Sequence, residues 1–210
     1  MYPLLLDETC WFLAVDFDKK TWQEDSRAFM DTCRELNVPA ALERSRSGNG
    51  GHVWIFFDRA IPAITARKLG CVILARAMER RHQLGLDSYD RFFPSQDTMP
   101  KGGFGNLIAL PLQAVPRKAG NSVFVDSNFQ PYPDQWGFLA AVQRVPMVIA
   151  ERIVTEAERK GDDRCPDQRH GRRVQTRSLD PAAIPEVVGT ADPRTVAGAG
   201  SDRSCQPRIR

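Results

Sequence analysis

The sequence of 210 residues contains no apolar run long enough to cross a membrane. Its start, MYPLLLDETCWF, has no basic leader before an apolar stretch and a small-residue cleavage site. Its five cysteines are an odd number, lie far apart and form no C-x-x-C pair, which argues against a zinc site or a disulfide framework. We therefore expect a protein of the reducing cytoplasm, with no membrane among its partners.

Paired histidines and a strong excess of one charge are also missing. None of His52, His82 and His170 belongs to an H-x-H or H-x-x-x-H pair, so a zinc hydrolase, a zinc deaminase and a paired-histidine nickase lack their ligands. No G-x-x-x-x-G-K-[ST] sequence occurs, which excludes a Walker phosphate loop. The net charge is only +3, so a contact with nucleic acid would need a local groove and not a global field.

Aromatic residues are missing from the C-terminal part, because no Phe, Trp or Tyr follows Phe138. Residues 161–210 are rich in Arg, Pro, Gly and Asp and show no sustained period of 2 or 3.6. Such a segment cannot bury enough apolar surface to offset the entropy that is lost on ordering. We expect one folded domain over residues 1–160 and a disordered Arg/Pro/Gly-rich tail over residues 161–210.

The apolar pattern of residues 1–160 predicts short strands interspersed with helices. The expected strands are 9–17, 38–44, 52–57, 88–93, 106–112 and 122–126, and the expected helices are 21–36, 62–83 and 134–160. Pro146 should kink or divide the last helix. Because strands and helices do not alternate as regular βα units, we predict an α+β fold with helices packed on a mainly antiparallel sheet.

The first expected strand ends in the sequence VDFD, which places two carboxylates close together. Alternate residues of a strand share a face, so Asp16 and Asp18 should point the same way. Two like charges this close repel, and burying them unpaired is costly, so a cation should lie between them. That cation is either a side chain, such as Lys19, Lys20 or an Arg, or a divalent ion such as Mg²⁺ or Mn²⁺, which prefers oxygen ligands.

The sequence ERSRSGNGGH, residues 43–52, gathers groups that suit a polyphosphate. Its glycines allow backbone to approach a ligand closely, and guanidinium, hydroxyl and imidazole groups surround them. The candidate nucleotide-binding residues are Arg44, Arg46, Ser47, Gly50 and His52. An ordinary glycine-rich hairpin turn with solvated arginines is the alternative interpretation.

Two further carboxylates, Asp90 and Asp97, bracket an aromatic and proline-rich stretch in SYDRFFPSQDTMPKGGFGNLIALPLQ, residues 88–113. A β-hairpin with a long polar loop would explain the same stretch without any site. The residues alone leave both interpretations open.

Five blocks, taken in order, together carry a resemblance to a known family. They are CWFLAVDFDKKTW, ALERSRSGNGGHVWIFF, SYDRFFPSQDTMPKGGFGNLIALPLQ, GNSVFVD and DQWGFLA. Over about residues 2–160 the chain resembles the catalytic domain of archaeo-eukaryotic primases, and most of all the primase domain of bacterial TOTE conflict systems. The resemblance implies an RRM-like, mainly antiparallel core with packed helices.

The resemblance also implies three active-site motifs. They are a D-x-D on a strand, a small-x-His, and a third acidic residue on a later strand. Asp16 and Asp18 match the first motif, and Gly50-Gly51-His52 matches the second. Asp90 is the choice for the third motif, with Asp97 as the alternative.

The activity that the resemblance implies is template-directed nucleotidyl transfer by a primase or primase-polymerase. Asp16, Asp18 and Asp90 would hold two Mg²⁺ or Mn²⁺ ions, and His52 with Ser47 and Arg46 would grip the phosphates of the incoming nucleotide. The implied partners are nucleoside triphosphates, a DNA or RNA template, and helicase and nuclease modules of the same bacterial defence system.

The resemblance has one departure, because members of that family carry more chain before the segment that corresponds to YPLL. We therefore expect residues 1–160 to be a catalytic domain that is N-terminally truncated relative to the family, a fragment or the product of a degraded gene. A metal-dependent nuclease that uses the same carboxylates, and a catalytically dead remnant that only binds nucleic acid, remain as alternative functions.

Overall fold

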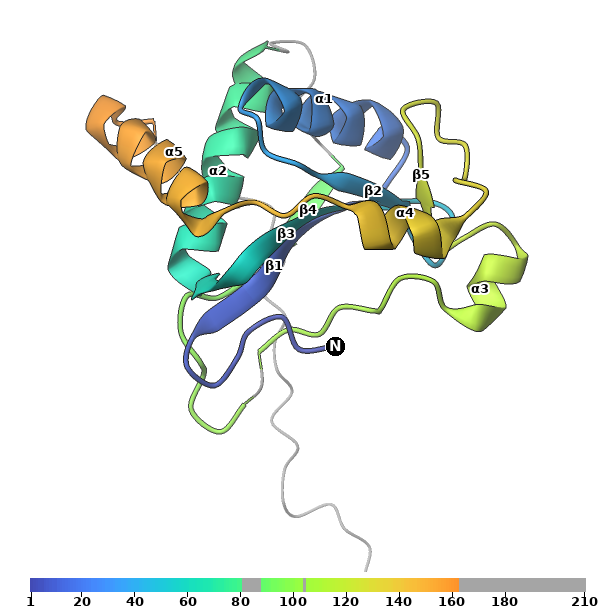
Figure 1. The fold of residues 1–210 in the computed structure, drawn as a ribbon, viewed down its shortest axis with the longest axis horizontal. Helices are drawn as coiled ribbons and strands as arrows, with labels where there is room; N and C mark the ends of the chain where they lie inside the picture. The colour runs from blue at the N-terminus through green and yellow to red at the C-terminus, as the bar shows by residue number, and fades with distance from the viewer. Residues whose placement is uncertain (81–87, 104, 163–210) are drawn as a thin grey trace, which may run out of the picture. The chain divides into compact units, whose positions relative to one another are not determined.

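The computed structural model describes residues 1–80, 88–103 and 105–162, and its centre is a five-stranded sheet (Figure 1). The strands lie in the order β4-β1-β3-β2-β5, and all neighbouring strands are antiparallel. They are β1 (Thr9–Phe17), β2 (Ala41–Arg44), β3 (Gly51–Pro62), β4 (Tyr89–Phe93) and β5 (Val123–Val125). The helices are α1 (Trp22–Glu35), α2 (Ala63–Arg80), α3 (Ala114–Lys118), α4 (Gln135–Ala141) and α5 (Met147–Lys160).

The order of the elements gives an RRM-like core. Along the chain β1, α1, β2, β3, α2 and β4 follow one another, and their strands lie in the order β4-β1-β3-β2. β5 adds a strand beside β2. The predicted α+β class, with helices packed on an antiparallel sheet, is therefore confirmed.

The two faces of the sheet bury two separate groups of apolar residues. From β1, the side chains of Leu13, Val15 and Phe17 join the larger core together with residues of α1, α2 and α5. Phe12 and Ala14 belong to a smaller core with Trp54, Phe93, Ile108, Leu112 and Phe124. Because alternate residues of a strand share a face, the next even positions of the chain, 16 and 18, fall on the side of the smaller core.

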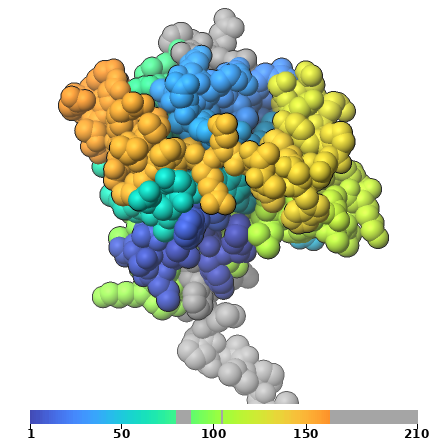
Figure 2. All heavy atoms as spheres, viewed as in Figure 1, coloured from blue at the N-terminus to red at the C-terminus, as the bar shows by residue number. Residues whose placement is uncertain are grey.

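The helix α1 has the pattern of a surface helix with one buried stripe. Its buried apolar residues Trp22, Phe29 and Cys33 recur at helical spacing and belong to the larger core. Glu24 and Asp25 lie in its first turn, where negative charge suits the positive end of the helix dipole. Figure 2 shows α1 (blue) at the surface between α5 (orange) and the residues that follow β5 (yellow).

The prediction of a strand over residues 106–112 is wrong. This segment instead crosses the face of the smaller core, where Ile108 and Leu112 are buried. Ile108 exchanges two backbone hydrogen bonds with Met1, of 2.9 and 3.1 Å, and not with a strand of the sheet. Leu107 and Leu110 are exposed, so burial does not alternate along this segment as it would along a strand with one buried face.

The helix predicted over 134–160 is divided, as the position of Pro146 suggested. α4 ends at Ala141 and α5 begins after Pro146, and Val145 between them donates a 2.7 Å hydrogen bond to the Phe56 carbonyl. The sequence did not predict the five-residue helix α3.

Parts of two sequence predictions lie outside the described residues, namely 81–83 of the second helix and 163–210 of the tail. The domain boundary at residue 160 therefore stays a prediction. Among the residues that the structure describes, no helix is both long and apolar enough to cross a membrane.

Candidate functional site

Three carboxylates from two neighbouring strands lie together at one end of the sheet. β1 pairs with β4 so that Asp16 is opposite Arg91 and Phe17 is opposite Tyr89, which leaves Asp90 as the extra residue at an irregularity of the ladder. One carboxylate oxygen from each of Asp16, Asp18 and Asp90 lies within 4.8 Å of the others. The structure thus brings together the three aspartates that the sequence singled out.

Asp97, the alternative for the third carboxylate, is not in this cluster. Its carboxylate forms an ion pair with Arg67 of α2. The residues in the cluster are therefore Asp16, Asp18 and Asp90, which we call the carboxylate cluster.

The charges of the carboxylate cluster oppose one another. Burial raises the pKa of Asp16 from its usual 3.8 to about 6, and the negative charges of Asp18 and Asp90 add to this rise while His52 and Arg91 oppose it. Arg91 Nε lies 2.6 Å from Asp90 Oδ2, so an arginine partner for one of the carboxylates is present. Burial is the largest cause of this raised pKa, so His52 and Arg91 do not fully compensate the cost of an ionised Asp16 at this site.

The carboxylate cluster fits a divalent cation by the chemistry of its donors. All three groups offer oxygen atoms, and hard ions such as Mg²⁺ and Mn²⁺ prefer oxygen ligands. A cation among them would also stabilise the ionised form of Asp16, whose pKa burial and the charges of Asp18 and Asp90 raise.

The turn between β2 and β3 packs against the end of β1. A Cβ atom added to Gly50 would lie 2.6 Å from Asp18 Oδ1 and 2.7 Å from the Phe17 carbonyl oxygen. These distances are shorter than side-chain atoms tolerate, so glycine is required for this approach. Gly50 therefore allows the turn to lie directly beside the carboxylate cluster.

His52 joins the carboxylate cluster through the pairing of the strands. In the ladder of β1 and β3 it lies opposite Asp16, and in the ladder of β2 and β3 it lies opposite Glu43. Its Nε2 atom is 3.5 Å from Asp16 Oδ1, and its Nδ1 atom is 3.1 Å from Glu43 Oε2. Asp16, His52 and Glu43 thus form a row across three strands on one face of the sheet.

The carboxylates of this row determine the direction in which the pKa of His52 is shifted. Burial by itself lowers the pKa of His52, but the hydrogen bond and the charge of Glu43, with the charges of Asp16 and Asp18, outweigh burial and raise it. The ring is therefore held in an environment that favours its positive charge.

Glu43 is a site residue that sequence reasoning missed. Its side chain is 2% exposed and accepts hydrogen bonds from Trp54 Nε1 at 2.8 Å and Ser122 Oγ at 3.2 Å, in addition to the contact with His52. The signal that could have found it is the register of the hairpin. A turn closed by the Ser45 amide on the Gly50 carbonyl places residue 43 opposite residue 52.

Asp25 is a second buried acid that was missed, because in the sequence it indicates only the first turn of a helix. It is 1% exposed and accepts hydrogen bonds from the hydroxyl and the amide of Ser88, at 2.6 and 3.2 Å. The Ser88 carbonyl in turn accepts a 2.7 Å hydrogen bond from the Asp18 amide. Asp25 thereby fixes the backbone that leads into both Asp18 and β4.

The remaining nucleotide-binding candidates, Arg44, Ser47 and Arg46, lie around the turn, but they contact different parts of the protein. Arg44 donates from Nη1 to the Gly120 carbonyl at 2.9 Å and from Nη2 to the Phe129 carbonyl at 2.6 Å, so its guanidinium holds backbone. Ser47 and Asp18 line one cleft of about 460 Å³, together with Lys19, Lys20, Trp22 and Asn49. Arg46 lines a different cleft of about 600 Å³, next to α3. Their role in nucleotide binding stays a prediction.

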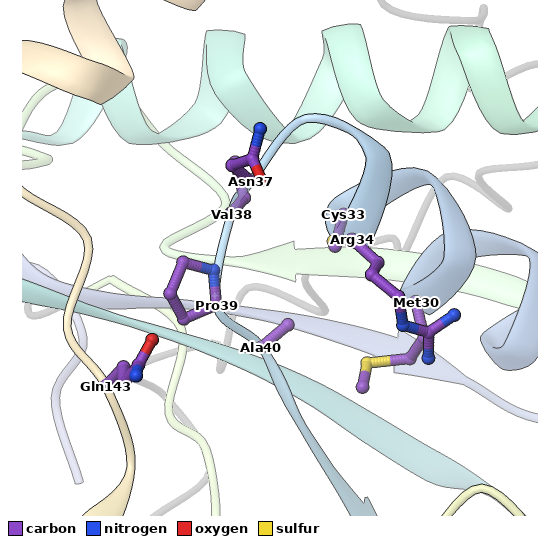
Figure 3. Close-up of a pocket in the computed structure, with 8 residues that line it drawn as sticks. All are labelled: Met30, Cys33, Arg34, Asn37, Val38, Pro39, Ala40 and Gln143. Carbon is purple, nitrogen blue, oxygen red and sulfur yellow. The ribbon is translucent and has the colours of Figure 1, made fainter.

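A further cleft contains none of these residues. It lies between the C-terminal part of α1, the segment that leads into β2, and Gln143 (Figure 3). Its lining includes Arg34 and Asn37 but no carboxylate. Of the carboxylate cluster, Asp18 instead lines the cleft beside the glycine turn.

Comparison with protein-family models matches residues 1–153 to the archaeo-eukaryotic primase domain of TOTE conflict systems. The comparison with curated proteins found no match. The matched range contains the carboxylate cluster, His52 and Glu43.

Proposed function

This chain belongs to the family of archaeo-eukaryotic primase domains of TOTE conflict systems, and from that premise we propose that it is a primase or primase-polymerase. The family indicates a nucleotidyltransferase type of activity. In the proposed reaction, nucleotides from nucleoside triphosphates are added to a growing strand along a DNA or RNA template. The finer points of this proposal are the metal ions, the grip on the nucleotide and the biological setting.

The observation that supports the proposal most strongly is the carboxylate cluster with His52 beside it. Asp16, Asp18 and Asp90 would hold Mg²⁺ or Mn²⁺, because they offer only oxygen ligands within 4.8 Å of one another. When bound, two such ions lower the pKa of the attacking 3′-hydroxyl and stabilise the negative charge on the triphosphate and the leaving pyrophosphate.

The side chains of the chain would bind and orient the nucleotide. Ser47 lines the cleft that also contains Asp18, Lys19 and Lys20, and we place the triphosphate there because hydroxyl and ammonium groups bind phosphate oxygens. His52 Nε2, 3.5 Å from Asp16 Oδ1, would contact the phosphates from the side of β3. The positive charge that its surroundings favour suits this role.

The two arginines of the turn would have different tasks. Arg44 would keep the glycine turn in place, because its guanidinium holds the backbone carbonyls of Gly120 and Phe129. Arg46 is exposed and lines the cleft next to α3, where it would contact phosphates of the nucleotide or of the template. Helicase and nuclease modules of the same system, acting in defence, are the proposed functional partners.

Primer extension with labelled nucleoside triphosphates tests the proposed function. The purified chain is incubated with a primer-template duplex and with Mn²⁺ or Mg²⁺, and both strand growth and loss of input strand are measured. We expect strand growth, and we expect Asp18→Asn to reduce it at least about 100-fold because a charged metal ligand is lost. Asp97→Asn is the matched control, since it removes a carboxylate outside the cluster.

Three results would contradict the proposal. Loss of the input strand without growth would indicate a metal-dependent nuclease. Binding of primer-template DNA without growth or loss would indicate a catalytically dead remnant. Equal activity of Asp18→Asn and the unaltered protein would remove the carboxylate cluster from the reaction.

A further inference from the structure

The imidazole ring of His52 could flip by 180°, which would exchange the positions of Nδ1 and Nε2. In the structure its contacts with β1 and β2 hold it in one of these two orientations. Its Nδ1 atom lies 3.1 Å from Glu43 Oε2, and its Nε2 atom lies 3.5 Å from Asp16 Oδ1. The ring is largely buried, with 14% of its side chain exposed. Only the edge that carries Nε2 is directed toward the carboxylate cluster.

Glu43 is itself fixed by two further donors. Trp54 Nε1 donates to the same oxygen that faces His52, at 2.8 Å, and Ser122 Oγ donates to the other oxygen at 3.2 Å. Trp54 lies on β3 and Ser122 directly precedes β5, so the carboxylate is held from both sides of β2. A carboxylate with three donors has little freedom to rotate.

We propose that Glu43 is a positioning residue, which orients His52 so that Nε2 and not Nδ1 faces the substrate phosphates. This inference rests on the proposed function of His52 in binding the nucleotide. Glu43 would not touch the substrate, because it is buried behind the ring. Its contribution would be the direction of the imidazole, in the same way that carboxylates orient the histidine ligands of metal sites.

Substitutions at position 43 separate orientation from charge. Gln keeps an acceptor for His52 and Trp54, and its amide group can donate to the Ser122 hydroxyl, so Glu43→Gln should preserve the direction of the ring. Glu43→Ala removes the acceptor and leaves the imidazole free to turn. We therefore expect Glu43→Gln to behave almost like the unaltered protein and Glu43→Ala to lose nucleotide affinity.

The experiment measures the Kd of a nucleoside triphosphate in the presence of Mn²⁺, and the KM and kcat of primer extension. Glu43→Ala should raise Kd and KM at least about tenfold, the size of effect that partners behind a first ligand have, with kcat changed much less. A merely structural role would instead lower the folded fraction, which reduces the apparent kcat and leaves KM unchanged. Asp126→Ala is the control for this case. Among the described residues, the Asp126 side chain accepts hydrogen bonds only within its own turn, from the amides of Asn128 and Gln130.

A double-mutant cycle tests whether Glu43 acts through His52. If it does, Glu43→Ala combined with His52→Ala should bind nucleotide no more weakly than His52→Ala alone. If the two losses multiply, Glu43 acts by another route and the inference is overturned.

A measurement on the ring itself does not depend on activity. The proton that His52 Nδ1 donates to Glu43 should be protected from exchange with water in the unaltered protein and in Glu43→Gln, and lost in Glu43→Ala, as seen by NMR of the imidazole. Protection in all three proteins would overturn the inference even if Glu43→Ala folds poorly for other reasons. A protected proton that is lost in Glu43→Ala, in a chain that never extends a primer, would instead leave the orientation standing and refute the proposed function.

Discussion

Asp16→Asn is expected to make the metal-free protein more stable at neutral pH, although it removes a candidate metal ligand. The reason is the pKa of Asp16, which burial and the neighbouring carboxylates raise to about 6 from its usual 3.8. An acid with a raised pKa in the folded state stabilises the fold most when it is protonated. Its contribution is fully present below about pH 4 and is lost as the pH rises through about 6.

The size of this effect follows from the shift in pKa. The rise in pKa from 3.8 to about 6 corresponds to about 3 kcal/mol of folding free energy. Above pH 6, where the carboxylate is ionised, the folded protein is destabilised by this amount. Asparagine has almost the same shape and no charge, so it removes this cost. For a domain of this size, 1 kcal/mol changes Tm by about 2–4 °C, so the increase in Tm at pH 7.5 should be about 6–12 °C.

The assay is thermal unfolding of both proteins between pH 4 and pH 8, in the presence of a chelator and again with excess Mn²⁺. With chelator, the gain from Asp16→Asn should be near zero at pH 4 and should grow through pH 6. With Mn²⁺ the gap should close, because an ion at 100 times its Kd stabilises the unaltered protein by about 2.7 kcal/mol and binds the variant less well. A gain that does not depend on pH, or a variant that is less stable at pH 7.5, would refute the reasoning.

Two further predictions concern the surroundings of the carboxylate cluster. Gly50→Ala should weaken Mn²⁺ binding and lower the free energy of unfolding by about 1–3 kcal/mol, because its Cβ would lie 2.6 Å from Asp18 Oδ1 and 2.7 Å from the Phe17 carbonyl oxygen. Chemical denaturation and a Mn²⁺ titration would measure both effects, and unchanged values would show that the turn can move away. Arg91→Ala should lower the Kd for Mn²⁺ several-fold, because it removes a positive charge that pairs with Asp90 at 2.6 Å. Weaker Mn²⁺ binding in this variant would show that Arg91 helps to hold Asp90 in place.

Much of the fold follows from local patterns in the sequence. The run from Thr9 to Phe17 predicts β1 with its correct bounds, and the alternation of its residues by itself places Asp16 and Asp18 on one face. Pro146 correctly indicates the division between α4 and α5. These features depend on backbone chemistry within a few residues, which a sequence displays directly.

The features that could not be predicted depend on contacts between distant residues. Residues 106–112 have the apolar pattern of a strand, but the partner of Ile108 is Met1 at the other end of the chain. Glu43 begins the ERSRSGNGGH stretch, but nothing in that pattern singles it out, and only its pairing with His52 and its contact with Ser122 show that it belongs to the site. From the sequence, only the resemblance favoured Asp90 over Asp97. The structure shows that Asp90 pairs with Arg91 beside the other two aspartates, whereas Asp97 pairs with Arg67.

The turn from Ser45 to Gly50 has a consequence for the insertions and deletions that this protein can accept. Surface turns usually accept changes in length, because few contacts depend on them. Here the turn sets which residues of β2 and β3 face each other, and a slip by one position would carry Glu43 to the opposite face of the sheet, away from His52. A single residue gained or lost in this exposed loop should therefore damage the protein as much as replacing the histidine, although no atom of the inserted residue need touch the substrate.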